Sequence, residues 1–116
     1  MGKGVVYEKS FDFALRVVKL SRFLVTEKRE FVLSKQVLRS GTAIGALVRE
    51  AEHAESKADF THKMSISLKE ANETLYWLEL LYQAQYIEKE HFYSIRNDNE
   101  ELLKLLISIV KSSKKS

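Results

Sequence analysis

The sequence predicts an all-α protein, an up-down-up-down antiparallel four-helix bundle. The 116 residues contain no proline and only four glycines, two of them among the first four residues, so little in the chain interrupts a helix. Apolar residues recur at helical spacing in four segments that short polar stretches separate. Hydrophobic residues make up 45% of the chain and charged residues 30%, which is typical of a globular protein with one core. We therefore expect a single domain over residues 1–116, with flexible ends at about 1–8 and 113–116.

The first helix is expected from Ser10, a plausible N-cap, to about Thr26. It carries two apolar faces, and we assign to the core the face formed by Phe11, Ala14, Leu15, Val18 and Val25. The apolar arc spans roughly 220°, where about 100° would suffice for one core-facing stripe. The extra ridge is a candidate interface between copies of the chain, and it consists of Phe13, Val17, Leu20 and Leu24. The alternative is that neighbouring helices of the same chain cover both faces.

The second helix is expected to follow the charged loop 27–30, with Ser34 as its cap, and to continue to about Ala54. Its buried stripe comprises Val37, Gly41, Ile44, Leu47, Val48 and Ala51. Gly41 and Gly45 lie one turn apart inside this helix. Because each glycine costs about 1 kcal/mol relative to alanine in a helix, the pair predicts a close contact with another helix.

The third helix is expected from Ser56, which forms a capping box with Asp59, to about Gln83. One narrow stripe faces the core, and it consists of Phe60, Met64, Leu68, Ala71, Leu75, Leu78 and Tyr82. A second apolar group lies away from that stripe in the C-terminal half of the helix. We assign this group to the same kind of interface between copies, and it consists of Tyr76, Trp77, Leu80 and Leu81.

The fourth helix is expected from about residue 88 to 112, after a last turn at 85–87. Its core residues are predicted to be Phe92, Ile95, Leu102, Leu103, Leu106, Ile109 and Val110. Four amphipathic helices joined by short loops favour the up-down-up-down arrangement.

The net charge of +3 is unevenly distributed along the chain. Residues 1–49 hold ten Lys/Arg against four Asp/Glu, and residues 50–101 hold five against twelve. Four further lysines follow in residues 102–116. Such a distribution indicates either nucleic-acid contact through the basic segments or pairing of basic with acidic segments, within one subunit or between subunits.

One helix face concentrates the basic residues. Lys35, Arg39 and Arg49 step along a single side of the second helix, and Arg16 and Lys19 occupy the polar strip of the first. A basic stripe on a helix can neutralise phosphates, so these five residues are candidates for binding RNA or DNA. No base-reading motif accompanies them, so such binding would be electrostatic and tolerant of sequence. The alternative is a solvated face, or pairing with acidic residues on the third helix of a neighbouring subunit.

Catalysis is not indicated. The chain has no cysteine and no G-x-S-x-G elbow. Glu50…His53 and Glu88…His91 resemble the E-x-x-H pairs of di-iron bundles, but the first pair projects on a polar face and the second lies at the end of the bundle. We expect no catalytic residue, no metal, no cofactor and no small-molecule substrate. The most apolar stretch, residues 102–110, is interrupted by Lys104 and Ser108, and no leader is visible. We therefore expect a cytoplasmic protein without a membrane partner.

Three blocks of sequence resemble a known family. They are QVLRSGTAIGA at 36–46, SKADF at 56–60 and LKEANETLYWLELL at 68–81. In this order and spacing they are similar to the small bacterial four-helix-bundle proteins encoded in 23S ribosomal-RNA intervening sequences. That family is similar in fold and assembly to the accessory variability proteins of diversity-generating retroelements, which form pentameric barrels and bind nucleic acid and a reverse transcriptase. The resemblance implies a homopentamer with no established biochemical activity.

Two function classes therefore remain open. The first is a non-catalytic oligomeric scaffold that binds RNA or DNA without sequence preference. The second is a purely structural or protein-interaction module. In both, the principal partner is another copy of the chain.

Overall fold

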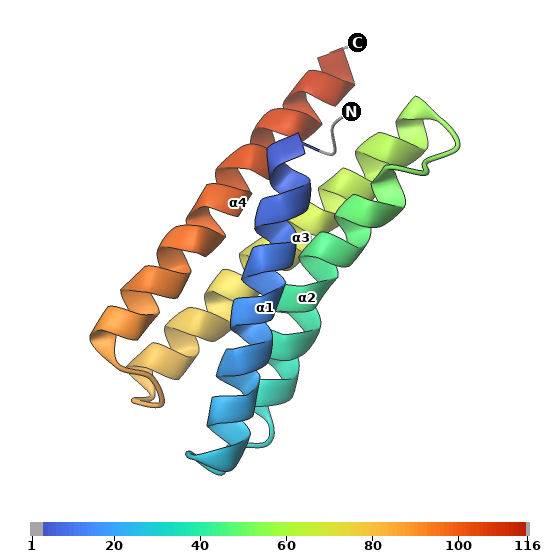
Figure 1. The fold of residues 1–116 in the computed structure, drawn as a ribbon. Helices are drawn as coiled ribbons and strands as arrows, with labels where there is room; N and C mark the ends of the chain where they lie inside the picture. The colour runs from blue at the N-terminus through green and yellow to red at the C-terminus, as the bar shows by residue number, and fades with distance from the viewer. Residues whose placement is uncertain (1–3, 116) are drawn as a thin grey trace.

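The computed structural model describes residues 4–115, which form four α-helices joined by short loops (Figure 1). Consecutive helices run in opposite directions, so the predicted up-down-up-down bundle is confirmed. The bundle measures 46 × 22 × 20 Å. The helices are α1 (Gly4–Thr26), α2 (Leu33–Ala51), α3 (Lys57–Gln83) and α4 (Lys89–Lys115).

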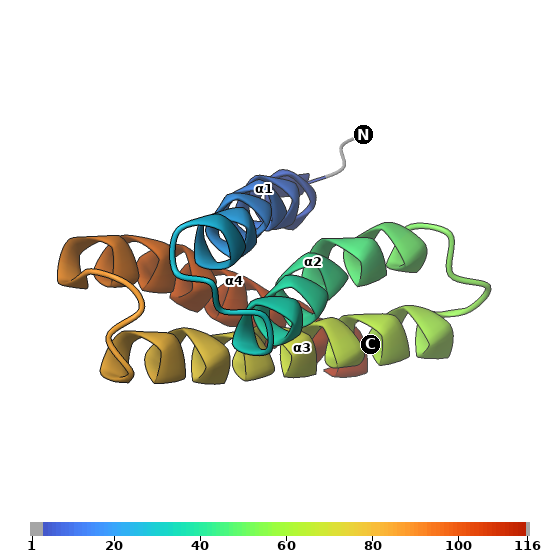
Figure 2. The ribbon, with the colours of Figure 1, turned by 90° about the horizontal axis from the view of Figure 1, so that it is seen from below.

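Helices that are consecutive in the chain pack most closely. α2 lies between α1 and α3, and α4 lies against α3, whereas α1 and α4 approach each other over a smaller contact. Seen from below, α1 and α3 lie on opposite sides of the molecule, with α2 and α4 between them (Figure 2). The molecule is therefore a sequence of three helical hairpins, with the seam between α1 and α4 the loosest.

The seam between α1 and α2 is held close by the two glycines of α2. A Cβ built on Gly41 would lie 2.7 Å from both Cγ methyls of Val17, and one on Gly45 would lie 3.3 Å from the carbonyl oxygen of Ser10. The close helix contact predicted from Gly41 and Gly45 is confirmed. It places the Val17 side of α1 against α2 and so decides which face of α1 is buried.

Small polar side chains fill the seams around α2. The buried Ser67 hydroxyl donates to the Ile44 carbonyl oxygen (2.9 Å), and the Thr74 hydroxyl bonds to the Ser40 hydroxyl (2.9 Å). These bonds satisfy polar groups that burial would otherwise leave without partners. Asn99 of α4 differs, because it is fully buried and neither atom of its amide has a hydrogen-bond partner in the described part of the chain.

The ends of the chain are more helical than expected. α1 begins at Gly4, so Ser10 is not its cap but a buried residue inside the helix, whose hydroxyl donates to the Tyr7 carbonyl oxygen (3.1 Å). Of the ends expected to be flexible, residues 4–8 belong to α1 and 113–115 to α4. Residues 1–3 and 116 lie outside the described residues.

The start of α2 is capped by the Glu30 side chain and not, as predicted, by Ser34. Ser34 lies inside the first turn, and the residue at the cap position, Val32, provides no side-chain bond. Instead, the Glu30 carboxylate accepts from the backbone N–H groups of Val32 (3.2 Å), Leu33 (2.9 Å) and Ser34 (2.7 Å). A carboxylate there also meets the positive end of the helix dipole, which stabilises it.

The two ends of α3 follow known capping patterns. The Ser56 hydroxyl accepts from the Asp59 backbone N–H (3.0 Å), as predicted, while the Asp59 carboxylate accepts from the N–H of Glu55 (3.2 Å). At the other end, Gln85 has φ +70°, and the N–H groups of Gln85 and Tyr86 donate to the carbonyl oxygens of Tyr82 and Leu81 (2.9 Å each). This is a Schellman motif with glutamine at the left-handed position that glycine usually occupies.

Candidate assembly and nucleic-acid surfaces

The two faces of α1 are the reverse of the sequence-based assignment. Phe13, Val17, Leu20 and Leu24 were expected at an interface between copies, but all four are fully buried in the core of the single chain. The assignment was wrong because the glycines of α2 admit the Val17 ridge, which leaves the opposite ridge outside. Phe11 and Leu15 are each 48% exposed and Val18 is 36% exposed. The unpartnered apolar face of α1 is therefore the one that was assigned to the core.

The second apolar group, on α3, is divided by the structure. Leu81 is fully buried, so its assignment to an interface was wrong: it belongs to the hydrophobic core of the single chain. Tyr76 is 56% exposed, Leu80 is exposed and Trp77 is half-buried. The Tyr76 and Trp77 rings meet edge to face, with centroids 4.9 Å apart. Three of the four candidates on α3 thus reach the surface in one place.

Trp77 belongs to a polar network that joins α3 to α2. The Glu73 carboxylate accepts from Trp77 Nε1 (2.9 Å) and from the Arg39 guanidinium, which also pairs with Glu70 (3.1 Å). The hydrogen bonds from Trp77 and Arg39 hold the pKa of Glu73 below its ordinary value, and the bond to Glu73 raises the pKa of Arg39. Arg39, a candidate for contact with nucleic acid, is therefore paired with two carboxylates of its own chain.

The other basic candidates do not form one surface. Arg16 of α1 pairs with Asp98 of α4 (2.8 Å), so it faces a different side of the bundle from Arg39. The Arg49 guanidinium lies over the rings of Tyr7 (4.7 Å to the centroid) and Phe11 (5.3 Å). Lys19 and Lys35 are exposed, and neither has an ion pair with another described residue.

Most ion pairs link the basic N-terminal part of the chain with the acidic middle part. Besides Arg16 and Arg39, Lys9 pairs with Glu101 across the seam between α1 and α4 (3.0 Å). Of the two interpretations of the charge distribution, the structure confirms pairing within one subunit. Sequence patterns could not indicate these pairs, because they depend on the register between helices.

A shallow groove of about 240 Å³ runs between α1 and α2 on the outer surface. Among the described residues, Arg49 is the only formally charged one that lines it. The lining residues are Tyr7, Ser10, Phe11, Ala14, Thr42, Gly45, Ala46 and Arg49. Such a set offers apolar contact and one cation rather than an acid–base pair. The groove continues the exposed apolar face of α1.

The two E-x-x-H pairs lie at the surface. Glu50 pairs with Lys63 (3.6 Å), and His53, Glu88 and His91 are exposed. Within residues 4–115, no three His, Cys, Asp or Glu side chains are grouped closely enough to hold a metal ion. In the same range, none of the helices combines the length and the apolar character needed to cross a bilayer.

Comparison with known proteins assigns the chain to a family. The family model for the 23S rRNA-intervening sequence proteins matches residues 3–108. The chain belongs to this family. Its fold is similar to the 1.70 Å crystal structure of a protein with unknown function from the S23 ribosomal protein family of Bacteroides thetaiotaomicron. The two chains are 60% identical with a TM-score of 0.93, and the match covers 96% of this chain and 99% of that one. No curated protein matches the sequence.

Membership in the 23S rRNA-intervening sequence proteins confirms the resemblance drawn from the three sequence blocks, all of which lie inside the matched range. The family description names no activity, and the structural neighbour is described as a protein with unknown function. The function of this member therefore has to be argued from its own surfaces.

Proposed function

We propose that this protein is a non-catalytic scaffold that assembles from several copies of itself. The observation that carries this proposal is the exposed apolar ridge on α1, formed by Phe11, Leu15 and Val18. A regular helix holds these side chains in place, so their exposure is a property of the folded chain. Contiguous apolar surface of this kind marks an interface in soluble proteins.

The outer face of α3 is the proposed counterpart of this ridge. Tyr76 and Leu80 are exposed there, next to Glu79, an exposed carboxylate without an ion pair among the described residues. The ridge on α1 is bordered by the exposed cations Lys19 and Arg22. Two different faces with complementary charge favour head-to-tail contact, which produces a closed ring when the rotation between copies closes. The number five comes from the family resemblance and completes the proposal of a homopentamer.

The absence of catalysis is part of the proposal. The groove beside α1 offers one charged group, Arg49, and that guanidinium already lies over two aromatic rings. The three histidines lie at the surface, and sequence and structure give none of them a serine or paired carboxylate in a catalytic arrangement. We expect the chain to act by what it assembles and presents.

Light scattering on the purified full-length chain tests the assembly. The wild type should form a stable oligomer several times the 13.4 kDa of one chain. Leu15→Glu and Tyr76→Glu should each dissociate it while helicity, measured by circular dichroism, stays unchanged. Ser108→Glu, at an exposed position of α4, is the matched control and should remain assembled.

A mixing experiment distinguishes head-to-tail contact from symmetric contact. Leu15→Glu keeps the α3 face intact, and Tyr76→Glu keeps the α1 face intact. Mixed in equal amounts, the two variants should form a dimer of one copy each, since a single productive contact remains. A wild-type monomer would contradict the scaffold proposal, and two variants that stay monomeric when mixed would contradict the head-to-tail arrangement.

Nucleic-acid binding is the second candidate, supported by the unpaired Lys19 and Lys35. The five proposed residues are Arg16, Lys19, Lys35, Arg39 and Arg49, and a ring would repeat them around its circumference. Binding should weaken steeply as salt is added. In a plot of the logarithm of the binding constant against the logarithm of the salt concentration, each neutralised phosphate should contribute a slope of about −0.9 on duplex DNA and about −0.7 on single strands. Lys19→Gln/Lys35→Gln should reduce affinity for generic RNA and DNA, whereas Lys69→Gln/Lys104→Gln should not. If Lys19→Gln/Lys35→Gln binds RNA and DNA as the wild type does, the nucleic-acid candidate is contradicted and the purely structural role remains.

A further inference from the structure

We propose that the turn between α1 and α2 docks this protein on the surface of a bilayer that contains anionic lipids. We call residues 27–32 the α1–α2 tip; it lies at the lower end of the bundle in Figure 1, where the chain passes from α1 to α2. The proposal does not depend on the assembly proposed above, because each copy carries a complete tip.

Two neighbouring apolar side chains of the tip extend into solvent. Phe31 is 49% exposed and Val32 is 69% exposed, the largest value among the large hydrophobic residues that the structure describes. Both precede α2, so neither belongs to the apolar ridges on α1 and α3. Exposure of two adjacent large apolar side chains is typical of a site where a partner takes up apolar side chains.

The tip is held in one conformation by hydrogen bonds at both ends. The Glu30 N–H donates to the Leu24 carbonyl oxygen (2.9 Å), and Arg29 occupies the left-handed region with φ +56°. The Glu30 carboxylate binds three backbone N–H groups at the start of α2. Phe31 and Val32 therefore follow directly on a fixed turn, and little order would have to be gained on docking.

The charge around the two apolar residues is positive. Arg22, Arg29 and Lys35 are exposed and have no ion pair among the described residues, and the Arg29 guanidinium lies 5.7 Å from the centre of the Phe31 ring. The carboxylate of Glu30 is directed at the amides of α2, which leaves Glu27 as the exposed acid of the turn.

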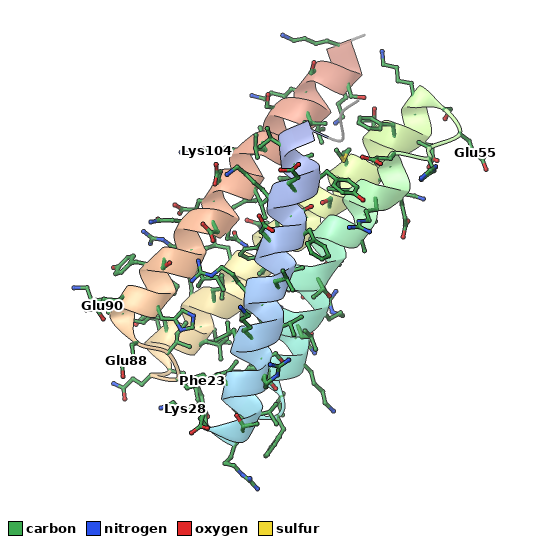
Figure 3. All side chains as sticks on the ribbon, in the orientation of Figure 1. Phe23, Lys28, Glu55, Glu88, Glu90 and Lys104 are labelled. Carbon is green, nitrogen blue, oxygen red and sulfur yellow. The ribbon has the colours of Figure 1, made fainter. Side chains whose placement is uncertain are left out.

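Lys28 is not counted among the free cations. It lies near the Phe23 ring, and it lines a hollow that Glu88 of the neighbouring turn also lines. Figure 3 shows Phe23 and Lys28 near the lower end of α1, with Glu88 and Glu90 to one side at the start of α4. These two acidic residues thus lie on the α4 side, whereas Arg29 lies at the Phe31 ring and Arg22 and Lys35 stand on the helices that lead into and out of the tip.

A lipid surface fits this combination better than a nucleic acid does. Phosphates of either partner can pair with the cations, but an aliphatic side chain as exposed as Val32 gains nothing from a phosphodiester backbone. In a bilayer, apolar side chains enter the boundary between headgroups and acyl chains, while Lys and Arg remain at anionic headgroups. The expectation of no membrane partner was based on sequence signals for insertion into a membrane, which a contact with the bilayer surface does not require.

Vesicle flotation with the full-length protein tests this proposal. The protein should float with phosphatidylcholine vesicles that contain phosphatidylglycerol, float much less with pure phosphatidylcholine, and be released by salt. Phe31→Ser/Val32→Ser should weaken binding at least tenfold, and Arg29→Asn/Lys35→Gln should do the same. The matched controls are Ile107→Ser, an exposed apolar residue of α4, and Lys104→Gln/Lys111→Gln, and both should bind as the wild type does.

Three outcomes would overturn the proposal. The first is no flotation with the anionic vesicles, and the second is equal flotation of Phe31→Ser/Val32→Ser and wild type. The third is loss of the oligomer, by light scattering, in that same double variant, which would make the tip a contact between copies. Polyuridine RNA serves as the competing probe: RNA binding that depends on Arg29 and Lys35 without any flotation would reassign the cations to nucleic acid.

Discussion

Val17 of α1 packs directly against Gly41 of α2, so closely that a single additional carbon on Gly41 would lie 2.7 Å from either methyl of the valine. The valine is fully buried, and its branched side chain has no free rotation with which to give way. This contact sets the spacing of α1 and α2 and determines which side of α1 faces solvent.

Gly41→Ala should destabilise the fold even though alanine favours a helix by about 1 kcal/mol. Overpacking in a dense core costs about 1–3 kcal/mol, which exceeds that gain. Urea unfolding measures the difference. Gly45→Ala should cost less, because a new Cβ would lie 3.3 Å from Ser10 atoms. Val17→Ala should destabilise the protein less in the Gly41→Ala background than in the wild type, because it removes the methyl groups that clash with the new Cβ. If the free-energy losses of the two single variants simply add up in the double variant, the proposed clash is contradicted.

Gln85→Gly should stabilise the protein by up to about 1 kcal/mol, because Gln85 holds the left-handed φ of +70° that costs a residue with a side chain about that much. Thermal unfolding provides the measurement. Gln83→Gly, two residues earlier and inside α3, is the matched control and should destabilise instead. A lower melting temperature for Gln85→Gly would argue against strain at this position.

Glu30→Gln should destabilise the protein by about 1–2 kcal/mol, since it removes the charge from an acceptor of three backbone N–H groups at the start of α2. Urea unfolding at neutral pH measures the change. Glu27→Gln removes the same charge three residues earlier, where no side-chain hydrogen bond or ion pair is formed among the described residues, and should have little effect. Equal losses in both variants would point to general charge effects and not to the cap.

Asn99→Leu should stabilise the fold by about 1–3 kcal/mol. A buried polar group without partners costs about that amount, and leucine has the same number of side-chain heavy atoms in the same branched arrangement, with no polar atom. Asn97→Leu, at an exposed position of α4, should leave the free energy of unfolding nearly unchanged. Destabilisation by Asn99→Leu would show that the amide is satisfied in solution.

The stability of the protein should fall as pH falls below 6.5, partly because of His91. Partial removal of water around its imidazole, together with the positive charge of Arg16, lowers the pKa of His91 in the folded state from 6.5. The unfolded chain then takes up a proton at higher pH than the folded chain does. The contribution of neutral His91 to the free energy of unfolding is therefore complete above the pKa of His91 in the unfolded chain, and it is lost as the pH falls through the pKa of His91 in the folded chain. His91→Gln should flatten this part of the curve of unfolding free energy against pH.

The fold could be predicted from the sequence to the extent that each helix shows one clear apolar stripe. On α2 and α4 polar and apolar faces contrast sharply, and residues such as Ile44 and Leu102 are buried as expected. On α1 both faces are apolar, so periodicity alone could not rank the Phe13–Val17 ridge against the Phe11–Leu15 ridge. The deciding contact lies on another helix, at Gly41.

The surfaces were less predictable, because they depend on register and on atoms far apart in the chain. Alignment along one helix suggested that Arg39 and Arg49 act together, but Arg39 reaches Glu73 of α3 and Arg49 lies over Phe11 of α1. The cap formed by Glu30 had a local signal, since an acid shortly before a helix favours its N-terminus. It was missed because Ser34 matched the more familiar capping pattern.

The order in which the helices pack has a consequence for how the chain reaches this structure. Each helix packs mainly against the helices next to it in the chain, and among the described residues the contact between distant segments, α1 with α4, is the smallest. Loops between partners are therefore short, and little entropy is lost in closing them before contacts form. Helical proteins built from such local contacts fold on a timescale of about microseconds to milliseconds. A chain emerging from the ribosome could thus complete each hairpin as soon as its second helix is available, with the seam between α1 and α4 closing last.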